Sequence, residues 1–182
     1  DFPHPERIKL AKKLCEISGI KGKNSVIFGV TGSDAIELAV RVARYFTGKP
    51  YILTAHGDYH GVTYGTMGLT TKGGMHPYFH PARPNMDVGY FPFPHPYRKP
   101  NDKYPGYDIN SLKIFQQTLE GKETVYTDGL NNINNVAAIL VEPFQSSAGY
   151  YIPPKEYLKI LREIADRHDM LLIVDEIQNG LG

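Results

Sequence analysis

The stretch MLLIVDEIQNGLG occupies residues 170–182 and combines two features that decide the fold. Its first half is an uninterrupted apolar run, which predicts a buried strand from Met170 to Val174. The run ends abruptly on two acids, Asp175 and Glu176, and a polar turn with glycine follows. Open α/β sheets place their functional groups beyond the carboxyl ends of their strands, so this stretch predicts a functional carboxylate at a sheet edge.

A second apolar run, VAAILV at residues 136–141, precedes the first and predicts another buried strand. Between the two runs, Pro154 is typical of the first position of a helix. An apolar stripe along that helix follows at Leu158, Leu161 and Ala165. Two continuously apolar strands joined by an amphipathic helix are typical of a parallel sheet that is covered on both faces. We therefore predict an α/β fold.

Upstream periodicity predicts further helices and strands. The predicted helices are 5–18, one that starts at 31–34, and 109–119, and the predicted strands are 24–28 and 51–55. Residues 57–74 are rich in glycine and allow at most a short helix. Residues 76–105 hold so many prolines that we predict no regular structure there. Their aromatic residues, such as Tyr90 and Phe91, favour an ordered excursion packed on the surface over a solvated linker.

Composition and charge exclude several classes of protein. A net charge of +1 over 182 residues argues against a nucleic-acid or acidic-membrane partner. Cys15 is the single cysteine, so no internal disulfide can form, and a reducing, cytoplasmic location is expected. No signal peptide and no apolar run of membrane-spanning length is present. The opening residues DFPHPERIKL are typical of the middle of a chain, which indicates a piece of a larger domain.

Thr31-Gly32-Ser33-Asp34 opens one of the predicted helices. A glycine and a hydroxyl residue at a helix start present free backbone N–H groups and the positive end of the helix dipole, which suits a phosphate. An ordinary N-cap explains the same residues, and this feature alone favours that interpretation. The sequence contains no GxxxxGK[ST], which excludes a P-loop, and FGVTGSDA does not match the dinucleotide fingerprint GxGxxG.

Asp58-Tyr59-His60-Gly61 follows the predicted strand 51–55. With glycine on either side, the ring of Tyr59 could lie flat against a planar ligand while the backbone approaches closely. A simple turn at the end of a strand explains these residues equally well. Glu142 follows another strand, so we expect it at the same sheet edge as Asp175. The alternative for Glu142 is a carboxylate that accepts hydrogen bonds from nearby backbone N–H groups.

Asp175 after LLIV has two chemical interpretations. It matches the Walker B pattern of ATPases, in which the acid holds magnesium, but no Walker A partner accompanies it. A carboxylate here can instead pair with a protonated ring nitrogen, which the pyridinium of pyridoxal phosphate needs in order to act as an electron sink. Gln178 could then donate to the phenolic oxygen of the cofactor. A phosphate cradle, a flat aromatic and this acid together favour pyridoxal phosphate, and we predict no metal site.

Four motifs carry a resemblance to a known family: TGSDAIE (31–37), DYHGVTYG (58–65), VEPFQSSAGYYIPP (141–154) and LLIVDEIQNGLG (171–182). In this order and spacing they resemble the class III pyridoxal-phosphate aminotransferases, which include 4-aminobutyrate, ornithine and acetylornithine enzymes. The resemblance implies the large domain of a fold-type I transferase, with a mixed but mostly parallel sheet and helices on both faces. Residues 1–182 would be the N-terminal portion of that domain.

The resemblance also implies a role for each matching residue. Asp175 matches the catalytic acid that pairs with the pyridine nitrogen. Tyr59 matches the aromatic that stacks on the ring, and Ile177 the apolar residue on its other face. Gly32 and Ser33 match the phosphate-binding turn. The full set of implied cofactor-binding residues is Gly32, Ser33, Tyr59, His60, Glu142, Asp175, Ile177 and Gln178.

Two departures from the family pattern affect the expected function. The family's Schiff-base lysine comes a few tens of residues after the position of Asp175, which places it beyond Gly182. We therefore expect residues 1–182 alone to bind the cofactor weakly and to be inactive, with Asp175 and the phosphate turn partly exposed to solvent. Ser147 stands where many members carry an acid that releases an arginine when a dicarboxylate binds, which argues against 2-oxoglutarate as the acceptor.

The intact protein is expected to be a homodimeric aminotransferase that moves an amino group from an ω-amino acid, such as 4-aminobutyrate, to a keto acid. A racemase, epimerase or lyase on the same scaffold is an alternative, because the cofactor residues do not set the outcome of the reaction. YFPFPHPYRKP (90–100) resembles an archaeal-type subgroup that includes amino-acid racemases. A nucleotide-binding ATPase module and a catalytically inactive fragment are two further interpretations of the same sequence.

Overall fold

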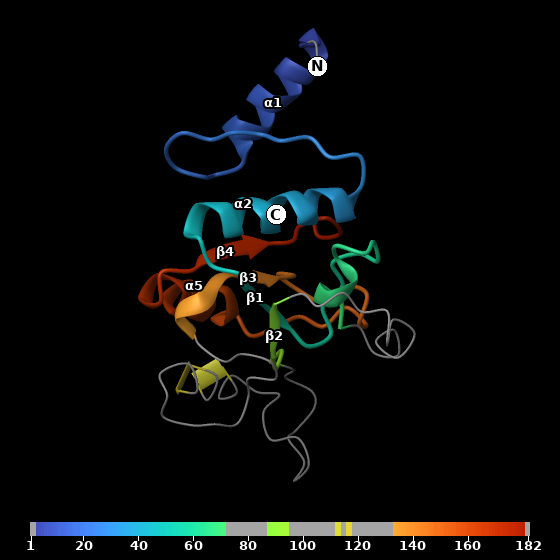
Figure 1. Ribbon diagram of the computed structural model, residues 1–182. Helices are drawn as coiled ribbons and strands as arrows, with labels where there is room; N and C mark the ends of the chain where they lie inside the picture. The colour runs from blue at the N-terminus through green and yellow to red at the C-terminus, as the bar shows by residue number, and fades with distance from the viewer. Residues whose placement is uncertain (1–2, 72–86, 95–111, 114–115, 118–132, 181–182) are drawn as a thin grey trace.

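The computed structural model of the chain describes residues 3–71, 87–94, 112–113, 116–117 and 133–180. Within them, four strands form one sheet in the order β2-β1-β3-β4 (Figure 1). Each neighbouring pair of strands runs parallel. The strands are β1 (Tyr51–Ala55), β2 (Val88–Phe91), β3 (Val136–Val141) and β4 (Leu171–Val174).

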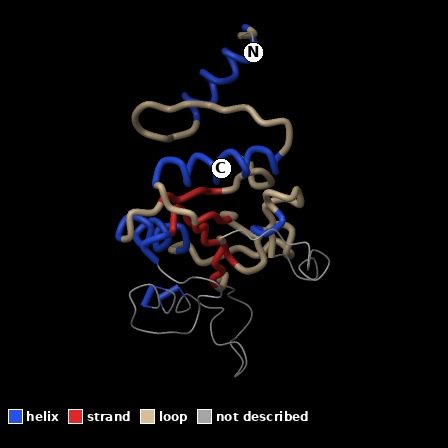
Figure 2. The backbone as a smooth tube through the Cα atoms, viewed as in Figure 1, coloured by secondary structure: helices blue, strands red, loops and turns tan. Residues whose placement is uncertain are grey.

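Two helices cover opposite faces of this sheet (Figure 2). Successive side chains of a strand point to opposite faces, so one strand can feed two hydrophobic layers. α2 (Gly32–Thr47) packs on the face that carries Ala138 and Leu140, and α5 (Tyr157–Arg167) packs on the face that carries Ile139. Every residue of β3 is buried. The prediction of a parallel sheet that is covered on both faces is therefore confirmed.

α1 (Pro5–Ile17) lies apart from the sheet, on the far side of α2, and buries none of its residues (Figure 1). Its span agrees with the predicted helix 5–18. Two of its large apolar residues are exposed, with Leu10 50% and Ile17 47% accessible. The structure also contains two short 3-10 helices, η1 (Met67–Leu69) and η2 (Ile133–Asn135). In the part of the chain that the structure describes, no helix has the length and apolarity required to cross a bilayer.

The carboxyl ends of the strands are aligned at one edge of the sheet. Val141 pairs with Val174, Thr54 pairs with Leu140, and Ala55 pairs with Phe91. Since the strands are parallel, the segments that follow β1, β3 and β4 start side by side. These segments carry the motifs that the sequence singled out, at 58–61, 142 and 175–178.

Two predictions about strands are wrong. Residues 24–28 form no strand, and none of the described strands pairs with them, although an extended segment needs a partner to complete its hydrogen-bonded ladder. Conversely, β2 lies within residues 76–105, where we predicted no regular structure. Pro92 follows directly after the last paired residue, so it borders the strand without interrupting it. Phe91 and Phe93 lie in the core and not on the surface.

Element boundaries and burial differ from prediction at three further places. Pro154 is not the first residue of a helix, because α5 begins at Tyr157, whose N–H donates to the Pro154 carbonyl at 3.0 Å. Among the described strands β4 pairs only with β3, and Val174 is 37% exposed, so this strand is less buried than predicted. The predicted helix 109–119 lies largely outside the described residues, although 112–113 and 116–117 are helical.

Candidate active site

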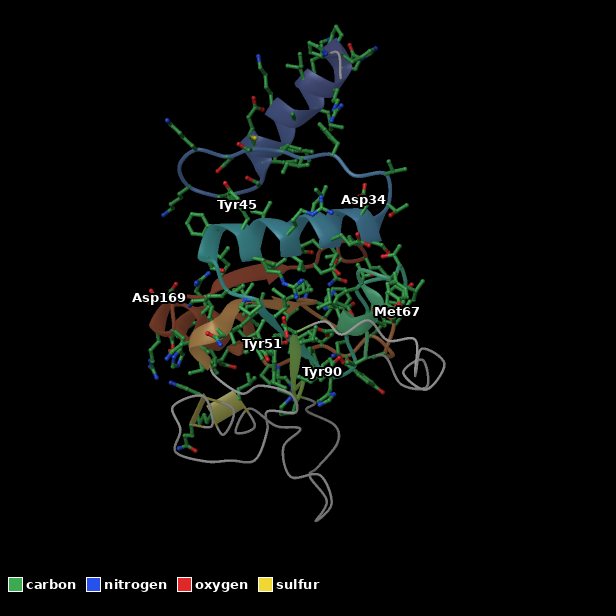
Figure 3. All side chains as sticks on the ribbon, viewed as in Figure 1. Asp34, Tyr45, Tyr51, Met67, Tyr90 and Asp169 are labelled. Atoms are coloured by element: carbon green, nitrogen blue, oxygen red, sulfur yellow. The ribbon has the colours of Figure 1, made fainter. Side chains whose placement is uncertain are left out.

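A cavity of about 220 Å³ opens at the carboxyl edge of the sheet, where the loops after β1, β3 and β4 meet the start of α2. Asp34 and Met67 mark this end of the molecule in Figure 3, and Tyr45 and Asp169 mark the opposite end. The residues that line the cavity are Thr31, Gly32, Ser33, Tyr59, His60, Gly61, Glu142, Asp175, Ile177 and Gln178. The structure thus brings together every cofactor-binding residue implied by the sequence. Their roles toward a cofactor stay predictions.

The first turn of α2 forms one wall of the cavity. The Thr31 hydroxyl accepts from the N–H of Asp34 at 3.1 Å, and the Asp34 carboxylate accepts in return from Val30 N at 2.9 Å. This reciprocal cap fixes the start of the helix. The cap uses the N–H of Asp34, while the N–H groups of Gly32 and Ser33 have no acceptor within a helix at this position. Both residues line the cavity, so the turn serves as an N-cap and also presents donors to a ligand.

Gly61 faces the same turn, and its neighbours leave no room for a side chain at this position. Its φ of +107° is unfavourable for residues with a Cβ. A Cβ built there would overlap Ser33 Oγ and would lie 2.8 Å from Thr66 Oγ1. The absence of a side chain therefore keeps the Ser33 hydroxyl accessible from the cavity.

Asp175 is buried, with 5% of its surface exposed, at the carboxyl end of β4. Its N–H donates to Val141 O at 2.8 Å, which continues the β3–β4 pairing by one residue. One carboxylate oxygen accepts from Ile177 N at 3.1 Å, and the other lies 2.7 Å from Nδ1 of His60. The expectation that Asp175 is partly exposed in this chain is wrong, because His60 and the following loop cover it.

His60 is buried beneath the cavity and lies between two acids. Its Nδ1 faces Asp175, and its Nε2 lies 3.1 Å from Thr54 Oγ1 and 3.5 Å from Asp58 Oδ2. Burial lowers the pKa of an imidazole, but hydrogen bonds and charge interactions with Asp175 and Asp58 outweigh it and raise the pKa of His60 to about 9. The two flanking acids therefore favour the doubly protonated, cationic form of His60 at neutral pH.

Asp58 and Glu142 join the loops after β1 and β3 through reciprocal hydrogen bonds. Glu142 Oε1 accepts from the N–H of Tyr59 at 2.8 Å, and Asp58 Oδ2 accepts from the N–H of Glu142 at 3.3 Å. Glu142 Oε2 also accepts from the backbone and hydroxyl of Ser146, at 3.1 and 3.0 Å. Burial raises the pKa of the Glu142 carboxyl, although these donors oppose the shift. Glu142 thus satisfies backbone N–H groups and also lines the cavity.

Tyr59 and Ile177 present the apolar part of the cavity lining. Tyr59 is half-buried, and Ile177 is 54% exposed and packs against Gly32, where a Cβ would lie 2.9 Å from its Cδ1. Gln178 is exposed and contributes an amide to the rim. Ser147 is half-buried and is not among the residues that line the cavity.

Several buried polar residues beneath the cavity were missed by the sequence analysis. They are Thr54, Asp58, Thr70, Gln145 and Ser146. Thr70 accepts from the N–H of His60 at 3.0 Å, and Gln145 donates to Asp58 at 2.8 Å. The position of Asp58 two residues before His60 was a usable signal, because an acid and a histidine at that spacing after a strand can meet in a turn.

Comparisons with known proteins place this geometry in context. A family model described as aminotransferase class III matches residues 2–182. The leucine/methionine racemase of Thermococcus litoralis is 38% identical over 183 residues, which cover 97% of this chain and 38% of that protein. A probable 4-aminobutyrate aminotransferase of Bacillus subtilis is 31% identical over 184 residues, which cover 97% of this chain and 39% of that protein.

A solved structure has a similar fold. The amine transaminase from an uncultivated Pseudomonas species, in its pyridoxal-phosphate-bound form, superposes with a TM-score of 0.79 at 28% identity. The match covers 100% of this chain and 40% of that one. The chain therefore spans about two fifths of the length of the proteins that it matches.

Proposed function

Because the chain belongs to the class III aminotransferase family, we propose that the full-length protein is a pyridoxal-phosphate-dependent aminotransferase. The observation that carries the proposal is the setting of Asp175. It is a buried carboxylate at the end of a parallel strand, it is held by His60, and it lines a cavity. That setting suits a partner for a protonated ring nitrogen.

Three predictions from the sequence are confirmed at the level of the family. The chain is a class III aminotransferase sequence, its fold is the fold-type I α/β class, and pyridoxal phosphate is the cofactor of that family. The reaction, the substrates and the residue roles are proposals that build on this assignment.

The residues that line the cavity fit this cofactor. When bound, pyridoxal phosphate supplies a charged ring that withdraws electrons from the carbon bearing the amino group. Asp175 would hold the proton on the ring nitrogen, since each of its oxygens accepts one described hydrogen bond and retains a lone pair. The start of α2 with Ser33 would bind the phosphate. Tyr59 and Ile177 would confine the ring.

We propose an ω-amino acid such as 4-aminobutyrate as the amino donor and a keto acid as the acceptor. The motifs of the chain and its similarity to the Bacillus subtilis protein support the donor class. Ser147 carries no charge, which favours a monocarboxylic acceptor such as pyruvate over 2-oxoglutarate. We further propose that residues 1–182 are the N-terminal portion of the large domain and that the lysine that forms the Schiff base with the cofactor lies outside them. We also propose that the protein is a cytoplasmic homodimer.

A racemase is the second candidate, because the Thermococcus litoralis relative at 38% identity is a racemase. The described cofactor residues do not separate the two reactions. By contrast, the ATPase interpretation loses support from the cavity itself. His60 Nδ1 lies 2.7 Å from Asp175, and the protonated ring that the neighbouring acids favour would oppose a magnesium ion there.

A two-part assay of the full-length protein with pyridoxal phosphate distinguishes the two candidates. Incubation with 4-aminobutyrate and pyruvate should produce alanine, detected by chromatography. The same protein should leave the configuration of single L-amino acids unchanged when no keto acid is present. Rapid racemisation without a keto acid, together with no alanine formation, would replace the aminotransferase assignment with the racemase one.

A further inference from the structure

Asp58 is a fully buried carboxylate that the proposed reaction does not use. It does not line the cavity, and its side chain is 0% exposed. Its Oδ1 accepts from the Gln145 amide at 2.8 Å, and its Oδ2 accepts from the N–H of Glu142 at 3.3 Å. The same Oδ2 lies 3.5 Å from Nε2 of His60. A buried carboxylate is costly unless it is paired, so this position calls for an explanation.

The explanation lies in the two sides of the His60 ring. Asp175 lies at Nδ1, while Asp58 and the Thr54 hydroxyl lie at Nε2. A neutral imidazole carries one N–H and can donate on one side only, whereas an imidazolium donates on both. The Thr54 hydroxyl can donate to Nε2 or accept from it, but the Asp58 carboxylate can only accept, so an acid on each side of the ring favours the doubly protonated form.

We propose that Asp58 is a positioning residue that acts through His60: it holds His60 in its doubly protonated form, and His60 in turn orients Asp175 toward the cavity. The inference rests on the proposed function, because Asp175 is the acid that the cofactor ring would meet. Asp58 would touch neither cofactor nor substrate.

Two other titratable residues, Glu142 and Tyr157, lie in the same buried cluster as Asp58, His60 and Asp175. Glu142 and Tyr157 both interact with the charge of Asp58, and burial is the largest cause that raises the pKa of each. Asp58 and Asp175 are the acids whose charges raise the pKa of His60 to about 9. Removal of the Asp58 charge should therefore make His60 lose its proton at a lower pH.

Asp58→Asn in the full-length, cofactor-loaded protein tests the inference, because it keeps the size and removes the charge. We expect the absorption band of bound cofactor to persist, kcat to fall about tenfold, and KM to change little. The alkaline limb of the kcat–pH profile should move down by about one pH unit, which corresponds to about a tenfold change in the proton affinity of His60. Asp166→Asn is the matched control, since Asp166 forms an exposed ion pair with Arg162 and should leave all three readouts unchanged.

A double-variant cycle separates action through His60 from a structural role in the loop contacts. Asp58→Asn added to His60→Gln should cause no further loss of kcat, because without the imidazole Asp58 can no longer act on Asp175. Losses that add, or an alkaline limb that stays in place in Asp58→Asn, would overturn the inference.

A measurement on the unmutated protein decides the question even if Asp58→Asn fails to fold. Proton NMR at pH 7.5 should show two downfield N–H signals that are absent in His60→Gln, one for each ring nitrogen. A single signal would mean a neutral ring and would refute the role of Asp58. This reading needs no cofactor, so failure of the unmutated protein to bind pyridoxal phosphate would refute the proposed function while the NMR result still decides the inference.

Discussion

Nδ1 of His60 lies 2.7 Å from Oδ2 of Asp175, and this contact connects the loop after β1 to the loop after β4. β3 lies between those strands in the sheet, and the contact passes across its carboxyl end. Both side chains are buried, so removal of either partner would leave the other charge buried and uncompensated. The orientation of Asp175 toward the cavity therefore depends on a residue 115 positions earlier in the chain.

Asp175→Asn in the full-length protein should abolish most of the activity. The amide cannot keep a proton on the ring nitrogen, and it leaves the buried cation of His60 without its closest anion. Removal of one partner of a buried ion pair commonly costs about 3–5 kcal/mol. A loss of that size in transition-state stabilisation corresponds to a rate factor of roughly a hundred or more. Steady-state kinetics measures the loss, with Asp169→Asn at an exposed position as the control. Activity close to that of the unmutated protein would contradict the role of Asp175.

Tyr59→Phe should bind the cofactor almost as well as the unmutated protein, whereas Tyr59→Ala should bind it about tenfold more weakly. Stacking uses the ring and not the hydroxyl, and a stacked aromatic pair contributes about 0.5–1.5 kcal/mol beyond the area that it buries. Titration of the absorbance of bound cofactor gives both dissociation constants. If the phenylalanine variant were as weak as the alanine variant, the hydroxyl would be the important group and the stacking role would be wrong.

Local patterns predicted the central fold because the strands β3 and β4 and the helix between them carry their own signals. The apolar runs at 136–141 and 170–174 and the stripe through Leu161 identify buried elements without reference to the rest of the chain. β2 escaped prediction because its four residues lie among prolines, and because its burial depends on pairing with β1. The strand prediction for 24–28 was wrong for the opposite reason: its composition is typical of a strand, but no described strand pairs with it.

The cavity lining was predictable to the extent that each residue stands beside a strand end or a helix start. Asp175, Tyr59 and Ser33 were found in this way. The network beneath them was not, because contacts such as Asp58 to Gln145 join residues 87 positions apart. The burial of Asp175 was missed for the same reason, since it results from His60 and not from the residues next to it.

Protonation of His60 should make the folded state more stable at neutral than at alkaline pH. The pKa of His60 is about 9 in the folded protein, above its ordinary value of 6.5. This contribution to the free energy of unfolding is therefore complete below about pH 6.5 and is lost as the pH rises through 9, an effect on the order of 3 kcal/mol. Urea unfolding of the full-length protein between pH 6.5 and 9.5 measures the change.

The variant His60→Gln isolates the contribution of this residue from that of other groups that titrate near pH 9. It should flatten the decline in stability, while His4→Gln at an exposed position should leave the decline intact. An equally steep decline in His60→Gln would assign the pH dependence to other groups.

Gly61→Ala should destabilise the protein and weaken phosphate binding together. The new methyl group would overlap Ser33 Oγ in the wall formed by the start of α2, and the φ of +107° disfavours any residue with a Cβ. We expect about 1 kcal/mol from the backbone and about 1–3 kcal/mol more from the overlap. Gly48→Ala is the matched control, because Gly48 also has a positive φ of +67° but has nothing within 4 Å of a Cβ. It should lose only the backbone part of the stability and none of the affinity. Urea unfolding and titration with pyridoxal phosphate measure the two effects in the full-length protein. Equal losses in the two variants would mean that Ser33 moves aside freely and that the close contact with Gly61 does not shape the phosphate turn.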